Sequence, residues 1–116
     1  MLAHYFVLGL LAHIVADAFL QNEWMALGKV NLKHPAAYVH SGLHLAAYLL
    51  VFPWPVAAVL GISHLLIDTR KPLRWWRKLI QQTNDPANPV FIPFALWQDQ
   101  EAHMLCLILA ALWMAR

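Results

Sequence analysis

The apolar residues of this chain are gathered into four long segments, which shorter polar or proline-containing stretches separate. The segments cover about residues 2–20, 35–52, 56–69 and 91–114. A helix needs about 20 apolar residues to cross the ~30 Å hydrocarbon core of a bilayer, and the first and last segments reach this length. The second and third are shorter, which a locally thinned bilayer or an oligomer can accommodate. The pattern predicts an all-α protein, a four-helix transmembrane bundle that forms a single domain over residues 1–116.

The connections carry the signals that end helices. Residues 21–34 are polar, and Pro53-Trp54-Pro55 ends the second segment, because proline stops a helix and restricts the residue before it. Residues 83–89 are rich in Asn, Asp and Pro, as loops are. Residues 73–82 place Trp and Leu side chains near one face and basic side chains mostly elsewhere. They predict a short amphipathic helix at the membrane interface, with an ordinary basic anchor as the alternative.

The composition also favours a membrane protein. The chain is 61% hydrophobic and 12% charged, whereas soluble domains have roughly 45–50% apolar and about 25% charged residues. A net charge of +2, without a basic stripe interleaved with aromatic residues, argues against nucleic acid as a partner. Cys106 is the single cysteine, which excludes an intrachain disulfide and a cysteine-rich zinc site.

The basic residues predict the topology. Seven of the eight Lys and Arg residues lie in the first and third connections, which share one side of a four-span bundle. The positive-inside rule assigns that side to the cytoplasm and places both termini outside. No Lys or Arg precedes Lys29, and His13 and Asp17 interrupt the first apolar segment. We therefore expect this segment to be a retained helix and not a cleaved signal peptide.

Each predicted helix carries one pair of ionisable residues spaced i, i+4, which puts both side chains on the same helix face. Pairs with this spacing can hold one metal ion together. Because the helices alternate in direction, all four pairs fall at about the same depth, toward the cytoplasmic side. The pairs are His13 with Asp17, His40 with His44, His64 with Asp68, and Asp99 with His103.

Ionisable groups inside a membrane are costly and usually mark function, so we predict that these eight residues bind metal. Eight ligands exceed the four of a tetrahedral zinc site and suit two divalent ions. Zinc is the first expectation, with iron or manganese as alternatives, because imidazole and carboxylate suit all three. A proton pathway and a purely structural polar network are the other readings of the same residues.

The surroundings of the pairs suggest further roles. Gln21 and Gln100 are expected to contact the ligands or the substrate, unless they are merely interfacial amides. Lys29, Arg70 and Lys71 lie just outside the ligand level, where they can hold a phosphate or simply anchor the protein to the membrane. Asp17, Asp68 and Asp99 are the candidate catalytic residues.

These motifs resemble a family of small bacterial membrane proteins, domain of unknown function family 3307. The resemblance covers nearly the whole chain, and Asp99-Gln100-x-x-His103 is its most distinctive motif. It implies a bacterial inner-membrane location and supports the architecture and the site. A looser likeness connects the chain to inner-membrane metal-dependent hydrolases.

Three functions fit these observations. The first is a membrane-embedded metal-dependent hydrolase that cleaves a phosphoester, such as that of a lipid-linked substrate. The basic residues at the mouth of a ligand-rich site agree with this function. A divalent-metal transporter or a metal-binding module is the alternative. A soluble di-metal bundle is the third, although such bundles use Glu-x-x-His at i, i+3. Membrane lipid is the expected partner, and the short second and third helices favour a homo-oligomer.

Overall fold

The structure is a computed structural model that describes residues 1–81 and 91–116, the side chains of Phe91 and Ile92 excepted. Every regular element in these ranges is helical. Helix α1 (Leu2–Ile14) continues as a π-helical segment, η1 (Val15–Phe19), and α5 (Lys71–Trp76) continues as a second one, η2 (Arg77–Gln81). The remaining helices are α2 (Glu23–Gly28), α3 (Pro35–Leu49), α4 (Trp54–Asp68) and α6 (Phe91–Met114).

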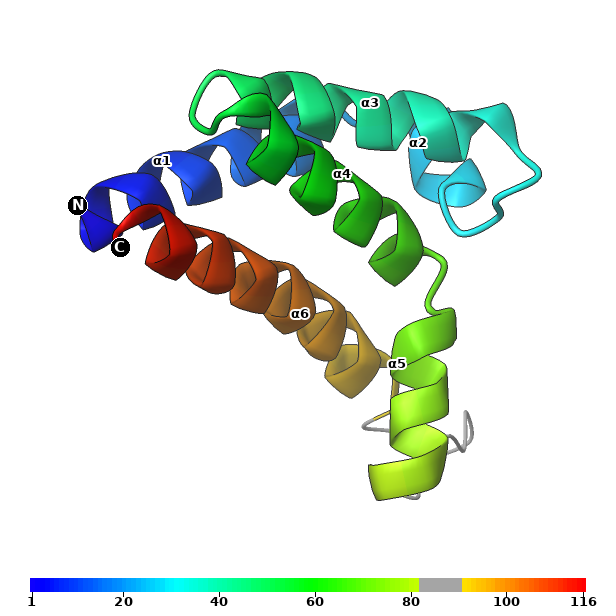
Figure 1. The fold of residues 1–116 in the computed structure, drawn as a ribbon. Coiled ribbons are helices and arrows are strands. Elements are labelled where there is room, and N and C mark those ends of the chain that lie inside the picture. Colours follow the sequence, from blue (N-terminus) through cyan, green and yellow to red (C-terminus); the bar gives the residue numbers. More distant parts are fainter. Residues whose placement is uncertain (82–90) are drawn as a thin grey trace.

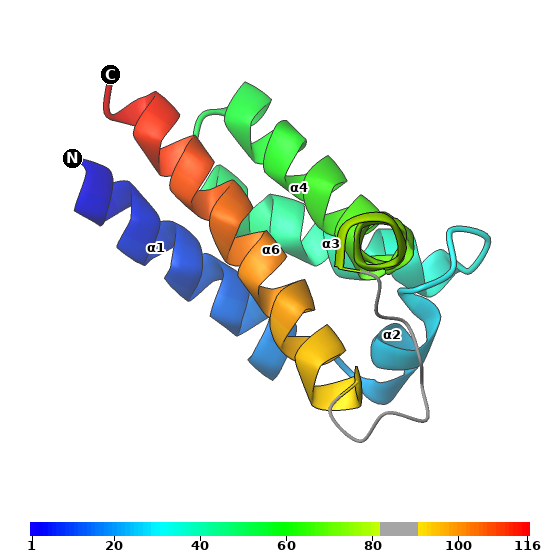
Figure 2. The same cartoon turned by 90° about the horizontal axis from the view of Figure 1, so that it is seen from below.

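The four long helices pack together around a shared interior (Figures 1 and 2). Helix α3 packs against α4, α1 against α6, α4 against α6, and α1 against α3. The two termini lie side by side at one end of the bundle, while α2 and α5 lie toward the other end (Figure 1). We call the end with Met1 and Arg116 the terminal end, and the opposite end, with α2 and α5, the connection end.

The all-α prediction is confirmed, and the four long helices lie where the apolar segments predicted them. The helix predicted over residues 73–82 is also present, since α5 and η2 together cover residues 71–81. The loop predicted over residues 83–89 lies outside the described residues.

Two details of the connections differ from the prediction. Helix α4 begins at Trp54, inside the predicted Pro53-Trp54-Pro55 connection, because proline is tolerated in the first turn of a helix. The polar stretch after α1 contains α2, which the sequence analysis did not predict. Asn22 starts this helix, since its side-chain oxygen accepts a hydrogen bond from the Met25 N–H at 2.9 Å.

One helix of the described part, Leu2–Phe19, is long and apolar enough to cross a membrane. Trp54–Asp68 is apolar but shorter. The four-span topology with both termini outside stays a prediction.

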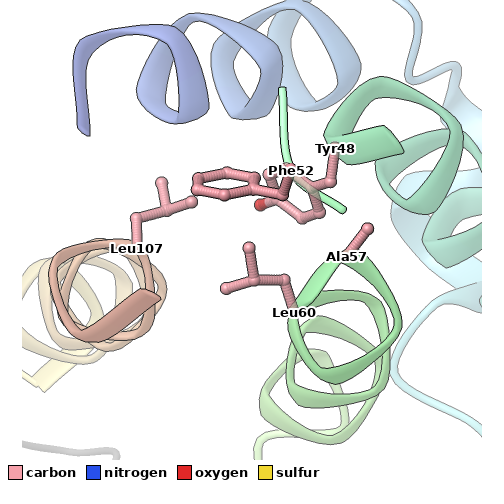
Figure 3. Packing of buried hydrophobic residues seen from close by; sticks show 5 residues of the cluster. All are labelled: Tyr48, Phe52, Ala57, Leu60 and Leu107. Carbon is pink, nitrogen blue, oxygen red and sulfur yellow. The ribbon is translucent and has the colours of Figure 1, made fainter. Parts of the chain in front are cut away.

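A small apolar cluster fills the terminal half of the bundle. It joins the end of α3 to the start of α4 and the middle of α6, and Figure 3 shows these side chains turned toward one another. Its members are Tyr48, Phe52, Ala57, Leu60 and Leu107, each at most 4% exposed. Along the chain, each of these residues lies nearer to the terminal end than the His/Asp pair of its own helix. The cluster therefore closes the polar interior on that side.

Candidate metal centre

The interior beyond this apolar cluster is polar. All five histidines of the predicted pairs and Asp68 are at most 3% exposed, while Asp17 and Asp99 are half-buried. Two groups of side chains have ligand atoms within 4.8 Å of one another. The first comprises Asp17, His40, His44 and His64, and the second comprises His64, Asp68 and His103.

Three ligand atoms from α3 and α4 form a nearly equilateral triangle. The Nε2 atoms of His40 and His64 are 3.1 Å apart, and Asp68 Oδ2 lies 3.2 Å from the first and 3.0 Å from the second. Atoms bound at about 2.0–2.1 Å to one tetrahedral ion lie about 3.3 Å apart. The triangle therefore has nearly the size of one face of a metal coordination shell.

The Asp68 carboxylate faces two sets of histidines at once. Its Oδ2 atom belongs to the triangle, whereas its Oδ1 atom lies 3.2 Å from His103 Nε2, on α6. A carboxylate that offers one oxygen to each side is the usual bridge between two metal ions a few ångströms apart. Asp68 thus offers one oxygen to the histidines on each side, and the two ligand groups share His64.

Asp17, on η1, belongs to the first group. Its Oδ1 atom lies 3.3 Å from His40 Nε2 and 3.6 Å from His44 Nε2. Asp17 belongs to η1, where the wider π-helical turn replaces α-helical geometry and Leu20 N–H donates to Val15 O. Such π segments are rare and are often found at functional sites.

Several buried atoms of this cluster lie close to one another without a well-oriented hydrogen bond within the described ranges. Asp17 Oδ1, His44 Nε2 and Asp68 Oδ2 belong to this set. Histidine nitrogens lie 3.0–3.6 Å from the two carboxylate oxygens, so these contacts are ionic contacts and not hydrogen bonds of good geometry. A buried polar atom without a hydrogen bond costs about 1–3 kcal/mol, and more if it is charged. A cation bound among these atoms would satisfy them together, so the residues fit a metal on an observation independent of the spacing in the sequence.

Two of the eight predicted ligands lie outside both groups. His13 is buried, but Tyr48 Oη lies 3.2 Å from its Nδ1 and Gln100 Oε1 lies 3.4 Å from its Nε2, so other side chains occupy both of its nitrogens. Asp99 Oδ2 is 3.8 Å from His103 Nε2, at the margin of the cluster. The structure thus brings six of the predicted ligands into the groups and places these two around them.

The residues predicted to surround the ligands also differ in how close they lie to the site. Gln100 lies in the site, since its Nε2 donates to Asp17 Oδ2 and Asp99 Oδ2, both at 3.5 Å. Gln21 is half-buried, and its Oε1 has no hydrogen bond in the part of the chain that the structure describes. Arg70 and Lys71 are exposed.

Lys29 lies inside the cluster, although the sequence placed it just outside the ligand level. Its Nζ atom is 3.6 Å from Asp17 Oδ1 and 3.8 Å from Asp68 Oδ1, and its side chain is only 14% exposed. The preceding Gly28 permits this position, because a Cβ atom there would approach Ala36 Cβ to 2.6 Å. Helix α2 can thus pack closely on α3 and deliver one ammonium group to the carboxylates.

Two contacts were missed in the sequence analysis. Tyr48 follows His44 by four residues and so shares its helix face, which is the signal that could have revealed it. Arg77, only 4% exposed, donates to Gln98 Oε1 at 2.9 Å and links η2 to α6. Burial, together with the neighbouring Arg74 and Arg70 charges, lowers the pKa of the Arg77 guanidinium.

Tyr48→Phe is expected to destabilise the protein by about 1 kcal/mol, because it leaves His13 Nδ1 without its partner. Chemical denaturation in detergent, with loss of helical circular dichroism as the signal, measures this change. Tyr5→Phe is the matched control, since Tyr5 stacks on Phe52 away from the His/Asp cluster. Equal stability changes in the two variants would contradict a role for the Tyr48 hydroxyl.

Comparison with known proteins places the chain in a family. No curated protein and no solved structure matches the chain, so the looser likeness to metal-dependent hydrolases finds no support there. A family described as protein of unknown function (DUF3307) matches residues 5–116, which is nearly the whole chain and includes every residue of the cluster. The chain therefore belongs to the DUF3307 family.

Proposed function

We propose that this protein is a membrane-embedded, metal-dependent hydrolase that cleaves a phosphoester at a dinuclear His/Asp centre. The observation that carries the proposal is Asp68, whose two carboxylate oxygens face different histidines. Zinc is the first candidate, with iron or manganese as alternatives. Lys29 adds a cation that is only 14% exposed beside the carboxylates, where an anionic substrate would need one.

The distribution of polar and apolar side chains supports the membrane location. The histidines and aspartates of the cluster lie inside, while the large apolar side chains on the outer faces are 38–88% exposed, which is the reverse of a water-soluble bundle. Exposed tryptophans occur at both ends, as in proteins that span a bilayer. These are Trp54 and Trp113 at the terminal end, and Trp24, Trp75, Trp76 and Trp97 toward the other end.

The roles of the residues follow from their positions. Bound metal would supply a hydroxide from water at neutral pH and neutralise charge on the phosphoryl group. Lys29 would hold a non-bridging phosphoryl oxygen. Asp99, the carboxylate outside both ligand groups, would accept the proton of the attacking water. Attack at phosphorus forms one P–O bond and breaks the ester P–O bond, and the alcohol leaves with a proton.

Metal removal provides the direct test. We expect the detergent-purified protein to hydrolyse members of a phosphatidate and prenyl-phosphate panel, to lose this activity on dialysis against a chelator, and to regain it with zinc or manganese. Activity that survives verified metal removal would contradict the mechanism. Metal uptake into proteoliposomes without any hydrolysis would favour the transporter instead.

A further inference from the structure

An apolar groove lies between α4 and α6 and encloses a cavity of about 400 Å³. On α4 it extends from Ser63 back to Pro55, and on α6 it extends from Cys106 forward to Trp113. The two helices run antiparallel, so both walls start beside the metal-centre residues and end at the terminal end. Eight residues of helix at ~1.5 Å rise give the groove a length of about 12 Å.

The inner end of the groove is next to the candidate centre. Ser63 precedes His64 directly, and Cys106 follows His103 by one turn. From this end the groove leads away from the basic connections and toward the middle of the predicted bilayer. A lipid of the cytoplasmic leaflet has the same layout, with its phosphate near the basic surface and its chains pointing inward.

We propose, on the basis of the proposed function, that this groove holds a hydrocarbon chain of the substrate, which would then be a lipid phosphoester. Charge and shape agree on this occupant, because Lys29 places a cation at the centre, where it can also contact a phosphate, and the groove offers an apolar channel that starts at the same depth. Water is a poor occupant of such a lining, since it would find too few polar partners. The groove positions the phosphoester for attack and adds little affinity, because the chain is already in an apolar medium.

Photolabelling tests the groove without relying on hydrolysis. Phosphatidate and prenyl phosphate with a diazirine near the end of a chain would be added to the protein in phosphatidylcholine vesicles, and the labelled peptides mapped by mass spectrometry. We expect at least one probe to label residues 55–63 and 106–113 in preference to the outer face of α1, and unlabelled lipid phosphate to suppress that labelling. Uniform labelling of all outer faces by both probes would show ordinary bilayer lipid only and overturn the proposal.

Groove-filling variants test the same point with activity. Ala110→Phe places a ring in the groove, and Val59→Trp does so from a position that is already 64% exposed, so its folding is less at risk. Both should remove the groove labelling and lower kcat/KM for the long-chain substrate by about tenfold, since misplacement of a reacting group has at least this cost. A short-chain analogue should be unaffected. Equal losses on both substrates would overturn the groove assignment.

The control is Ala58→Phe, which fills a different cavity, of about 280 Å³, between α3 and α4. It should leave labelling and chain-length dependence unchanged. Failure of the proposed function has a distinct signature, because groove labelling would then persist while no panel substrate was hydrolysed. Failure of the groove assignment would leave hydrolysis intact and insensitive to Ala110→Phe.

Discussion

Asp68→Asn is expected to abolish binding of both metal ions, with metal content falling from about two ions per chain to well below one. The amide keeps the size of the side chain but removes its charge and its ability to bridge, and both oxygens of Asp68 face histidine nitrogens at 3.0–3.2 Å. Loss of an outer-shell partner alone weakens metal binding by about 10–100-fold, so loss of a bridging ligand should weaken it more. Elemental analysis of the detergent-purified variant measures the change.

Glu101→Gln is the matched control for Asp68→Asn. It removes the same charge from an exposed position on α6, two residues from Asp99. We expect it to keep the metal content of the unmodified protein. Retention of two ions by Asp68→Asn would contradict the bridging arrangement, whereas retention of one would show that the two groups bind independently.

Two simple rules predicted from the sequence which helix faces carry the cluster and at which depth of the bundle it lies. Residues four apart share a helix face, and alternating spans return each pair to the same depth. These rules depend on helix geometry alone, so they placed His40, His44, His64 and His103 near one another before any packing was known. The all-α fold was predictable for a similar reason, because long apolar segments leave few other choices.

The departures from the prediction arise where packing decides. Helix geometry puts His13 on the inner face, but only the packed structure shows that Tyr48 and Gln100 occupy its nitrogens. The π-helical turn around Asp17 has no signal in residue spacing. Lys29 entered the cluster through α2, a helix too short to be recognised from apolar periodicity and one whose close packing depends on Gly28.

Lys29→Met is expected to lower kcat/KM for phosphoester hydrolysis by about 10²–10³, which is the usual cost of losing one preorganised electrostatic contact in a transition state. The variant should still bind two metal ions, because Lys29 competes with cations for Asp17 and Asp68 and does not help to bind them. Steady-state kinetics on the fastest panel substrate, with elemental analysis of the same preparation, tests both statements. Lys33→Met, exposed in the same connection, is the control and should change neither quantity.

The combination of readouts separates a substrate contact from a structural one. If Lys29 only balanced the buried carboxylates, its loss would lower folded yield, metal content and activity together, and Lys29→Arg would restore all three. If it holds a phosphoryl oxygen, metal affinity stays equal or rises while activity falls, since one competing positive charge has been removed from beside the ligands. Arginine would then restore part of kcat/KM, because a guanidinium also binds phosphate but with a different geometry. A parallel loss of metal and activity in Lys29→Met would therefore assign a structural role to Lys29. It would also remove the main argument for an anionic substrate.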